Sequence, residues 1–239
     1  MAAIRSLLFL LAVSLLTVVV CSLLLLCFWT PRPMRRFIEQ MWVVPVIWLI
    51  KHLLGIKYEL RGRENLPQQP LVILCKHQSA WETIVLQEVF PDVLYVWKKE
   101  LKAIPFFGWA LAVTPMISID RSAGKDALKQ LVTQGRLRLA QGHPIIIFPE
   151  GTRAAPGHKR RYKVGGAYLG IEAGVPLLPV ALNSGEVWGR NAWLKRPGTV
   201  VVSIGPAIQT AGINAEEANK RAEAWIEAEM RRIDPEAYR

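Results

Sequence analysis

The sequence predicts an α/β fold in which a mixed central sheet is covered by helices, preceded by an N-terminal membrane-anchoring helical segment. Residues 7–29 contain no charged side chain. Beyond Gly55, short apolar runs alternate with longer amphipathic runs, a pattern typical of strands that alternate with covering helices. The residues left after the apolar stretch suit one compact domain. We therefore predict one domain and an anchor within the 239 residues.

The first apolar stretch is long enough to cross a bilayer. As a helix that rises about 1.5 Å per residue, residues 7–29 extend roughly 35 Å, which spans a bilayer core of about 30 Å. A cleaved signal peptide would have a shorter apolar region and a small-x-small cleavage pattern. Here the stretch is followed by Thr-Pro-Arg-Pro at residues 30–33. We therefore expect an anchor.

Basic residues around this stretch predict its orientation. They are denser after it than before it, where Arg5 and the terminal amine stand alone; the later group is Arg32, Arg35 and Arg36. Positive charge is retained on the cytoplasmic side of a membrane. The expected location is thus a membrane, the inner membrane if the cell is bacterial, with the catalytic domain facing the cytoplasm.

A second apolar stretch, residues 37–54, is interrupted by a carboxylate, a proline and two basic side chains: Glu39, Pro45, Lys51 and His52. These interruptions predict a kinked or interfacial helix rather than a second span. A shallow hairpin in one leaflet and a buried core helix are the alternatives. The expected division is an anchor at 1–56, with an apolar helix at 6–29 and an interfacial helix at 37–55, and one domain at 57–239.

The body contains ten predicted elements. Short runs rich in Val, Ile and Leu predict strands at residues 71–75, 93–97, 116–119, 144–148, 176–181 and 199–204. Longer runs with apolar side chains at helical spacing predict helices at residues 80–89, 125–141, 165–173 and 215–232. Gly142 follows the second of these helices, where a helix stop is expected. Loops at the strand ends are the expected place for chemistry.

Charge and cysteine content narrow the possible partners. The formal net charge is +11, which suggests an anionic partner such as nucleic acid, anionic lipid, a phosphate ester or a phosphopantetheine-bearing acyl donor. No nucleic-acid motif or interleaving of aromatic and basic residues is present, so nucleic acid is not expected. The three cysteines suggest neither a disulfide framework nor a zinc cluster, and they favour a reducing compartment.

Residues 77–82 read His-Gln-Ser-Ala-Trp-Glu and follow a predicted strand. This spacing places the His77 imidazole at a strand end and the Glu82 carboxylate in the helix that follows. A carboxylate that holds one ring nitrogen of a histidine fixes the tautomer, so the other nitrogen can remove a hydroxyl proton. A capping histidine with an exposed helical glutamate is the alternative. The other histidines form no ligand-spaced cluster, so no metal is expected.

Residues 148–153 read Phe-Pro-Glu-Gly-Thr-Arg and also follow a predicted strand. Such a loop suits a phosphate, because Gly151 permits close backbone approach and Thr152 offers a hydroxyl. Arg153 presents a planar fork of donors that matches phosphate oxygens. The alternative is an ordinary turn with a surface arginine.

Together, these blocks resemble the glycerolipid acyltransferase family that includes the 1-acyl-sn-glycerol-3-phosphate acyltransferases. The resemblance covers roughly residues 71–182, and its motifs stand in the family's order. Besides the two motifs above, the shared blocks are residues 98–101, 104–108, 119–121 and 175–180. The resemblance implies a fold like that of the glycerol-3-phosphate acyltransferases.

The resemblance also implies an activity. A fatty acyl group would pass from acyl-CoA or acyl-acyl carrier protein, as co-substrate, to the free hydroxyl of 1-acylglycerol-3-phosphate, giving phosphatidic acid without a metal or cofactor. His77 would be the base and Glu82 its orienting residue. The matched acceptor-binding residues are Lys98, Arg121, Glu150, Gly151, Thr152 and Arg153. The expected partners are thus a lysophospholipid, the acyl donor and membrane lipid.

Two departures from the family pattern bear on these expectations. The family usually has Asp where Glu82 stands, so the carboxylate arm here is one methylene longer. It commonly has Gly and Phe where this chain has Pro115 and Ser118, which bears on the acceptor. The alternatives are another acceptor, such as lyso-ornithine lipid, and a catalytically weak lipid-binding membrane protein. The apolar runs 104–109 and 175–180 are expected to be core rather than an acyl channel.

Overall fold

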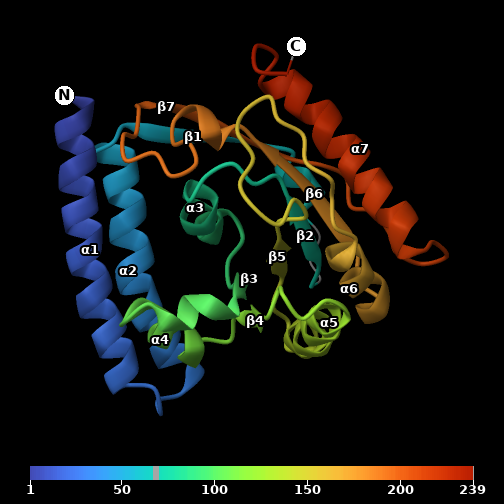
Figure 1. The fold of residues 1–239 in the computed structure, drawn as a ribbon, viewed down its shortest axis with the longest axis horizontal. Coiled ribbons are helices and arrows are strands. Elements are labelled where there is room, and N and C mark those ends of the chain that lie inside the picture. Colours follow the sequence, from blue (N-terminus) through green and yellow to red (C-terminus); the bar gives the residue numbers. More distant parts are fainter. Residues whose placement is uncertain (67–69, 239) are drawn as a thin grey trace.

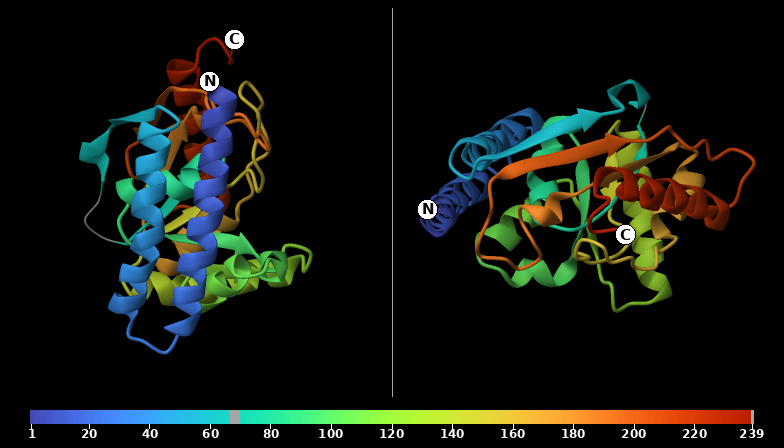
Figure 2. Two further views of the ribbon diagram at one scale, coloured as in Figure 1. Left: turned by 90° about the vertical axis from the view of Figure 1, so that its left-hand side faces the viewer. Right: turned by 90° about the horizontal axis from the view of Figure 1, so that it is seen from above.

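The computed structural model describes residues 1–66 and 70–238. Helices α1 (Ala2–Leu26) and α2 (Arg32–His52) form an antiparallel pair along one side of the molecule (Figures 1 and 2). Helix α1 contains neither Gly nor Pro, so no residue in it interrupts the helix. A proline stands in the first turn of α2, where its missing N–H costs no hydrogen bond. Between the helices, the Trp42 Nε1–H donates to Thr17 Oγ1 at 2.9 Å.

The centre of the molecule is a seven-stranded mixed sheet with the strand order β1-β7-β6-β2-β5-β3-β4. The strands are β1 (Ile56–Arg61), β2 (Val72–Cys75), β3 (Leu94–Lys98), β4 (Ile117–Ile119), β5 (Ile145–Ile147), β6 (Leu177–Leu182) and β7 (Gly198–Ile204). Neighbouring strands are parallel, except that β6 and β7 are antiparallel. Five strands, β6, β2, β5, β3 and β4, therefore end at the same edge of the sheet.

Helices cover both faces of the sheet. One face packs against α1, α2 and α3 (Trp81–Val89), and the other against α5 (Lys125–Ala140), α6 (Gly165–Ala173) and α7 (Ala215–Ile233). Because side chains alternate along a strand, β2 contributes Ile73 and Cys75 to the first core and Val72 and Leu74 to the second. Figure 1 shows the helical pair and α7 on opposite sides of the sheet.

Helix α7 is a well-defined amphipathic helix. Its N-cap residue, Asn214, accepts a hydrogen bond from the Glu217 N–H at 2.8 Å. Carboxylates occupy the first turn and arginines the last turn, which complements the helix dipole. Its apolar stripe includes Ala222, Ile226 and Met230, all fully buried against the sheet.

The mixed α/β sheet and all ten predicted elements of the body are confirmed, with ends that differ by a residue or two. One further strand and one further α-helix were not predicted, nor were three short 3₁₀ helices. Strand β1 alternates apolar and charged residues, as a half-buried edge strand does. Helix α4 (Phe107–Val113) overlaps the apolar run 104–109. The expectation that this run is core was wrong, because Ile104, Phe106 and Trp109 are exposed. Three short 3₁₀ helices complete the fold: η1 (Arg63–Asn65), η2 (Lys99–Ala103) and η3 (Ser184–Glu186).

The predicted bounds of the N-terminal helices were wrong by a few residues. Helix α1 ends at Leu26, before the predicted position 29, because residues 27–29 form a turn. Helix α2 begins at Arg32 rather than 37, since prolines fit the first turn of a helix, and it continues through Pro45. Within the described residues, α1 is the one helix long and apolar enough to cross a membrane.

Candidate active site

His77 lies just beyond the end of β2, at the edge where the parallel strands end. Its ring stacks on the ring of Phe148, which follows β5, with centroids 3.9 Å apart and planes 16° apart. The His77 carbonyl accepts a hydrogen bond from the Ala154 N–H at 2.8 Å. Stacking and backbone contacts together hold the imidazole, whose side chain is 15% exposed.

Glu82 lies behind His77, in the first turn of α3, and is completely buried. Its Oε1 accepts hydrogen bonds from the backbone N–H groups of Gln78 and Ser79, each at 2.8 Å, and from Ser184 Oγ at 2.7 Å. Its Oε2 lies 3.7 Å from His77 Nδ1, which has no hydrogen-bond partner among the described residues. The alternative of an exposed helical glutamate is therefore wrong.

The Phe-Pro-Glu-Gly-Thr-Arg loop turns sharply after β5. Gly151 has a φ of +71°, a left-handed conformation that disfavours other residues, and its carbonyl accepts a hydrogen bond from Arg121. Arg153 donates to Asn191 Oδ1 at 3.0 Å. Thus residues after β4, β5 and β6 meet at one place, because these parallel strands end at the same edge.

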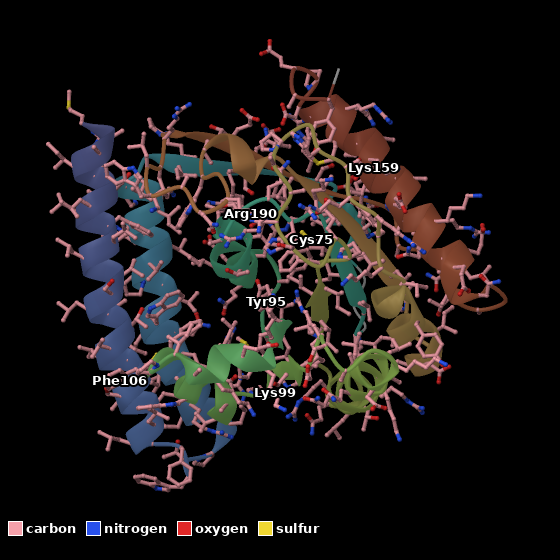
Figure 3. The ribbon with its side chains drawn as sticks, viewed as in Figure 1. Cys75, Tyr95, Lys99, Phe106, Lys159 and Arg190 are labelled. Atoms are coloured by element: carbon pink, nitrogen blue, oxygen red, sulfur yellow. The ribbon has the colours of Figure 1, made fainter. Side chains whose placement is uncertain are left out.

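A cavity of about 710 Å³ opens in front of His77. One group of lining residues is polar and basic: His77, Lys98, Arg121, Thr152, Arg153 and Arg190. A second group is apolar and comes from α1, α2 and α4: Val20, Leu24, Trp42, Val43, Phe107 and Leu111. Arg190 and Tyr95, which also lines the cavity, are labelled in Figure 3. The cavity therefore has the two kinds of wall that an anionic amphiphile requires.

The electrostatics of this cavity favour an anion. Lys98, Arg121, Arg153 and Arg190 all line it, whereas Glu82 and Glu150 do not. Glu39 also lines it, but its carboxylate is paired with Arg32 at 2.8 Å. Burial lowers the pKa of Arg121, against the opposing effect of Glu100. An arginine remains charged despite such a shift. Within the described residues, no group of three or more His, Cys, Asp or Glu side chains is arranged to hold a metal.

The structure brings six of the eight predicted site residues to the cavity: His77, Lys98, Arg121, Gly151, Thr152 and Arg153. The predicted contact of Glu150 with the acceptor is not supported. Its carboxylate is buried beneath the site, where Oε2 accepts the His77 N–H at 2.8 Å and Oε1 pairs with the Lys76 ammonium at 2.9 Å. Because both oxygens are engaged there, Glu150 faces away from the cavity.

Four residues at this site were missed by the sequence analysis: Lys76, Ser184, Arg190 and Asn191. Lys76 directly precedes the histidine motif, and the others follow β6. A signal was available, because β6 was predicted as a strand and loops at strand ends carry chemistry. The residues themselves form no recognisable motif, so only their position identifies them.

Comparison with known proteins decides the family. Residues 57–183 match the family model described as Acyltransferase. The chain belongs to the acyltransferase family. This acyltransferase is 47% identical over 207 residues to a 1-acyl-sn-glycerol-3-phosphate acyltransferase of Pseudomonas aeruginosa, an alignment that covers 85% of this chain and 80% of the relative. It is 29% identical over 194 residues to 1-acyl-sn-glycerol-3-phosphate acyltransferase alpha of Mus musculus, covering 79% and 68%.

The fold of this acyltransferase also has a solved counterpart. It is similar to the crystal structure of the 1-acyl-sn-glycerophosphate (LPA) acyltransferase PlsC from Thermotoga maritima, with a TM-score of 0.78. The similarity covers 98% of this chain and 97% of that chain at 20% sequence identity. It includes the N-terminal helices as well as the sheet, so the whole architecture is shared.

Proposed function

We propose that this acyltransferase moves a fatty acyl group from acyl-CoA or acyl-acyl carrier protein to the free hydroxyl of 1-acylglycerol-3-phosphate, giving phosphatidic acid in phospholipid synthesis. The observation that carries the proposal is the cavity in front of His77, with basic side chains on one wall and apolar helices on the other. The names of the relatives from Pseudomonas aeruginosa and Mus musculus support the same acceptor.

The reaction needs one base and no covalent intermediate. Glu82 lies on the Nδ1 side of His77, which leaves Nε2 as the nitrogen that accepts the hydroxyl proton. The hydroxyl oxygen attacks the thioester carbonyl carbon, the carbon–sulfur bond breaks, and the thiolate takes the proton from the imidazolium. The Glu82 carboxylate stabilises that imidazolium. Catalytic hydrogen bonds are often long in the free enzyme and tighten when substrate binds, so we expect the 3.7 Å separation to shorten in the substrate complex.

Basic side chains and the loop after β5 account for acceptor binding in this proposal. Arg153 and Arg121 hold the acceptor phosphate, Lys98 adds a further positive charge, and the backbone at Gly151 together with the Thr152 hydroxyl completes the cradle. The acyl chains lie along the apolar wall that α1, α2 and α4 contribute.

We infer a membrane location from the N-terminal pair of helices. Both ends of α1 contact the body: Phe9 packs edge-on against the Trp188 ring, and Leu24 lies in a cluster with Ala110 of α4. A helix that crosses the bilayer alone would leave the body at one end. We therefore favour the hairpin in one leaflet, with the body on the cytoplasmic side. Exposed apolar side chains of the pair face the lipid, among them Leu11, Leu15, Phe37 and Trp48.

A panel of lysolipid acceptors tests this proposal. The purified enzyme would be given 1-acylglycerol-3-phosphate, lyso-ornithine lipid or lysophosphatidylethanolamine, each with acyl-CoA and with acyl-acyl carrier protein, and thiol release would be recorded. We expect the highest kcat/KM with 1-acylglycerol-3-phosphate. A higher value with lyso-ornithine lipid would assign the enzyme to that acceptor, and binding without thiol release would make it a lipid-binding protein.

A further inference from the structure

A cluster of buried charges lies directly beneath the active site. The Lys76 ammonium is 2.9 Å from Glu150 Oε1 and 2.9 Å from Glu227 Oε1. Lys76 is fully buried, and the two glutamates are 4% and 6% exposed. Glu227 also accepts a hydrogen bond from the Tyr162 hydroxyl at 3.0 Å. Helix α7 is thereby tied to the ends of β2 and β5.

The cluster reaches the catalytic histidine through its backbone. Glu150 Oε2, the oxygen that faces away from Lys76, accepts the N–H of His77 at 2.8 Å. The Lys76 N–H donates to the Val180 carbonyl on β6 at 2.9 Å. A continuous chain of contacts thus runs from Glu227 through Lys76 and Glu150 to His77.

Stability alone is a weak explanation for this cluster. Burying charges costs several kcal/mol per ion, and apolar residues of similar volume are often as stabilising or more so. Two carboxylates share one ammonium, so the cluster retains a charge that apolar packing would avoid. The charges instead fix orientation, because the Lys76 ammonium and the His77 N–H hold the two oxygens of Glu150, and Lys76 and the Tyr162 hydroxyl both hold Glu227 Oε1.

We infer that Lys76 and Glu227 are positioning residues for the acyl transfer: through Glu150 they hold the backbone of His77, so that helix α7 sets the geometry of the active site from outside the cavity. The inference rests on the proposed role of His77 as the base. Displacing a reacting group by about 1 Å costs on the order of 100-fold in rate, which makes such a support consequential.

The charge state of Glu150 gives this role a pH signature. Burial raises the pKa of Glu150, the Lys76 ammonium and the His77 N–H lower it, and Glu227 raises it. Burial lowers the pKa of Lys76, but Glu150 and Glu227 raise it by more than burial lowers it. The pKa of Lys76 is therefore raised overall, and the ammonium stays charged. Other titratable groups near Glu150 are Cys75 at the end of β2, Tyr162 and Lys163 from the loop before α6, and Tyr238 from the C-terminus.

Opposite substitutions should therefore move the acid limb of the kcat–pH profile in opposite directions. Lys76→Met removes the cation that favours ionised Glu150, so the acid limb should move to higher pH and kcat near neutrality should fall about 10- to 100-fold. Glu227→Gln removes a carboxylate that disfavours the ionised form of Glu150, so the acid limb should move to lower pH. Because His77 is then positioned less tightly, kcat should also fall by roughly threefold to tenfold. KM for acceptor and donor should change little.

Glu229→Gln is the matched control. Glu229 lies on the same helix, is 9% exposed and accepts a hydrogen bond from Ser203 Oγ at 2.8 Å, away from Lys76. It should lose stability as Glu227→Gln does but keep the kcat and pH profile of the unsubstituted enzyme. Thermal unfolding of each purified variant confirms that it is folded. If Lys76→Met does not fold, the comparison of Glu227→Gln with Glu229→Gln decides.

His77→Ala separates the inference from the function on which it rests. If His77→Ala keeps full activity, the proposed base is wrong. If His77→Ala is inactive while folded Glu227→Gln has the kcat and acid limb of the unsubstituted enzyme, His77 stands and the inference is overturned. Equal losses of kcat in Glu227→Gln and Glu229→Gln would also overturn it, since they would reflect only the stability of α7.

Discussion

Glu82 shows how a residue longer than the usual aspartate fits beside His77, the proposed base. Its extra methylene carries the carboxylate to two backbone N–H groups and to the Ser184 hydroxyl, leaving one oxygen toward His77. Hydrogen bonds to a charged acceptor contribute about 1.5 to 3 kcal/mol each. The carboxylate is therefore fixed by the ends of β2 and β6 rather than by the histidine alone.

Substitutions at Glu82 and Ser184 should be coupled. Glu82→Gln presents an amide NH₂ where donors already converge, so kcat should fall by about tenfold or more, within the range a general base contributes. Ser184→Ala should cause a smaller loss, and Glu82→Asp should keep partial activity. The double variant Glu82→Gln/Ser184→Ala should be less than additive. Single-turnover rates check this; full additivity would mean that Ser184 does not act through Glu82.

Arg153 should discriminate acceptors by their phosphate. A lysine supplies only a point charge, so Arg153→Lys should be impaired, and Arg153→Ala should lower kcat/KM for 1-acylglycerol-3-phosphate by about 10- to 100-fold or more. The donor KM should change little, and the loss should shrink for an acceptor without phosphate. Equal losses on both acceptors would give Arg153 a structural role through Asn191, to which it already donates.

At the scale of elements, η2 and α4 were the hardest to predict, because they depend on a close contact between the backbones of the two helices. A Cβ on Gly108 would collide with the backbone carbonyl of Leu101, so only glycine lets α4 pack on η2. Phe106, just before α4, has a positive φ of 59°, which is strained for an aromatic residue. The spacing of apolar residues predicts which face of an element is buried, but it does not predict a close backbone contact. The long amphipathic runs of α5 and α7 were predictable from that spacing.

Gly108→Ala should therefore displace α4 and deform the apolar wall of the cavity. We expect a lower midpoint of thermal unfolding and a raised acceptor KM, because Phe107 and Leu111 of α4 line that wall. The control is Gly142→Ala, where a Cβ meets nothing within 4 Å although φ is +90°, so backbone strain alone is measured. A Gly108→Ala enzyme no less stable than Gly142→Ala would show that α4 tolerates the shift.

For the whole molecule, the pattern of short and long apolar runs predicted an α/β sheet with covering helices, including six of the seven strands. Six of the eight predicted site residues lie together because they follow or end neighbouring parallel strands, whose carboxyl ends meet at one edge of the sheet. What the pattern did not supply was the buried charge beneath the site. Lys76, Glu150 and Glu227 come from distant parts of the chain and meet only through the packing of α7 on the sheet.

The N-terminal pair should bind the membrane without carrying the body across it. The enzyme should remain with the membrane fraction in the absence of detergent, and reporters at both termini should be found in the cytoplasm. This follows because α1 and α2 are antiparallel and both ends of α1 contact the body. Recovery in the soluble fraction, or an N-terminal reporter outside, would contradict the hairpin.

The most direct test of the central claim is phosphatidic acid formed per enzyme, measured by mass spectrometry with 1-acylglycerol-3-phosphate and an acyl thioester, for the unsubstituted enzyme and for His77→Ala. The unsubstituted enzyme should release one thiol for each phosphatidic acid. His77→Ala, shown to be folded by a cooperative thermal unfolding transition, should lose about 10²- to 10⁴-fold in kcat, as expected when a general base is removed. Phosphatidic acid formed at an undiminished rate by His77→Ala, or none formed by the unsubstituted enzyme, would contradict the account.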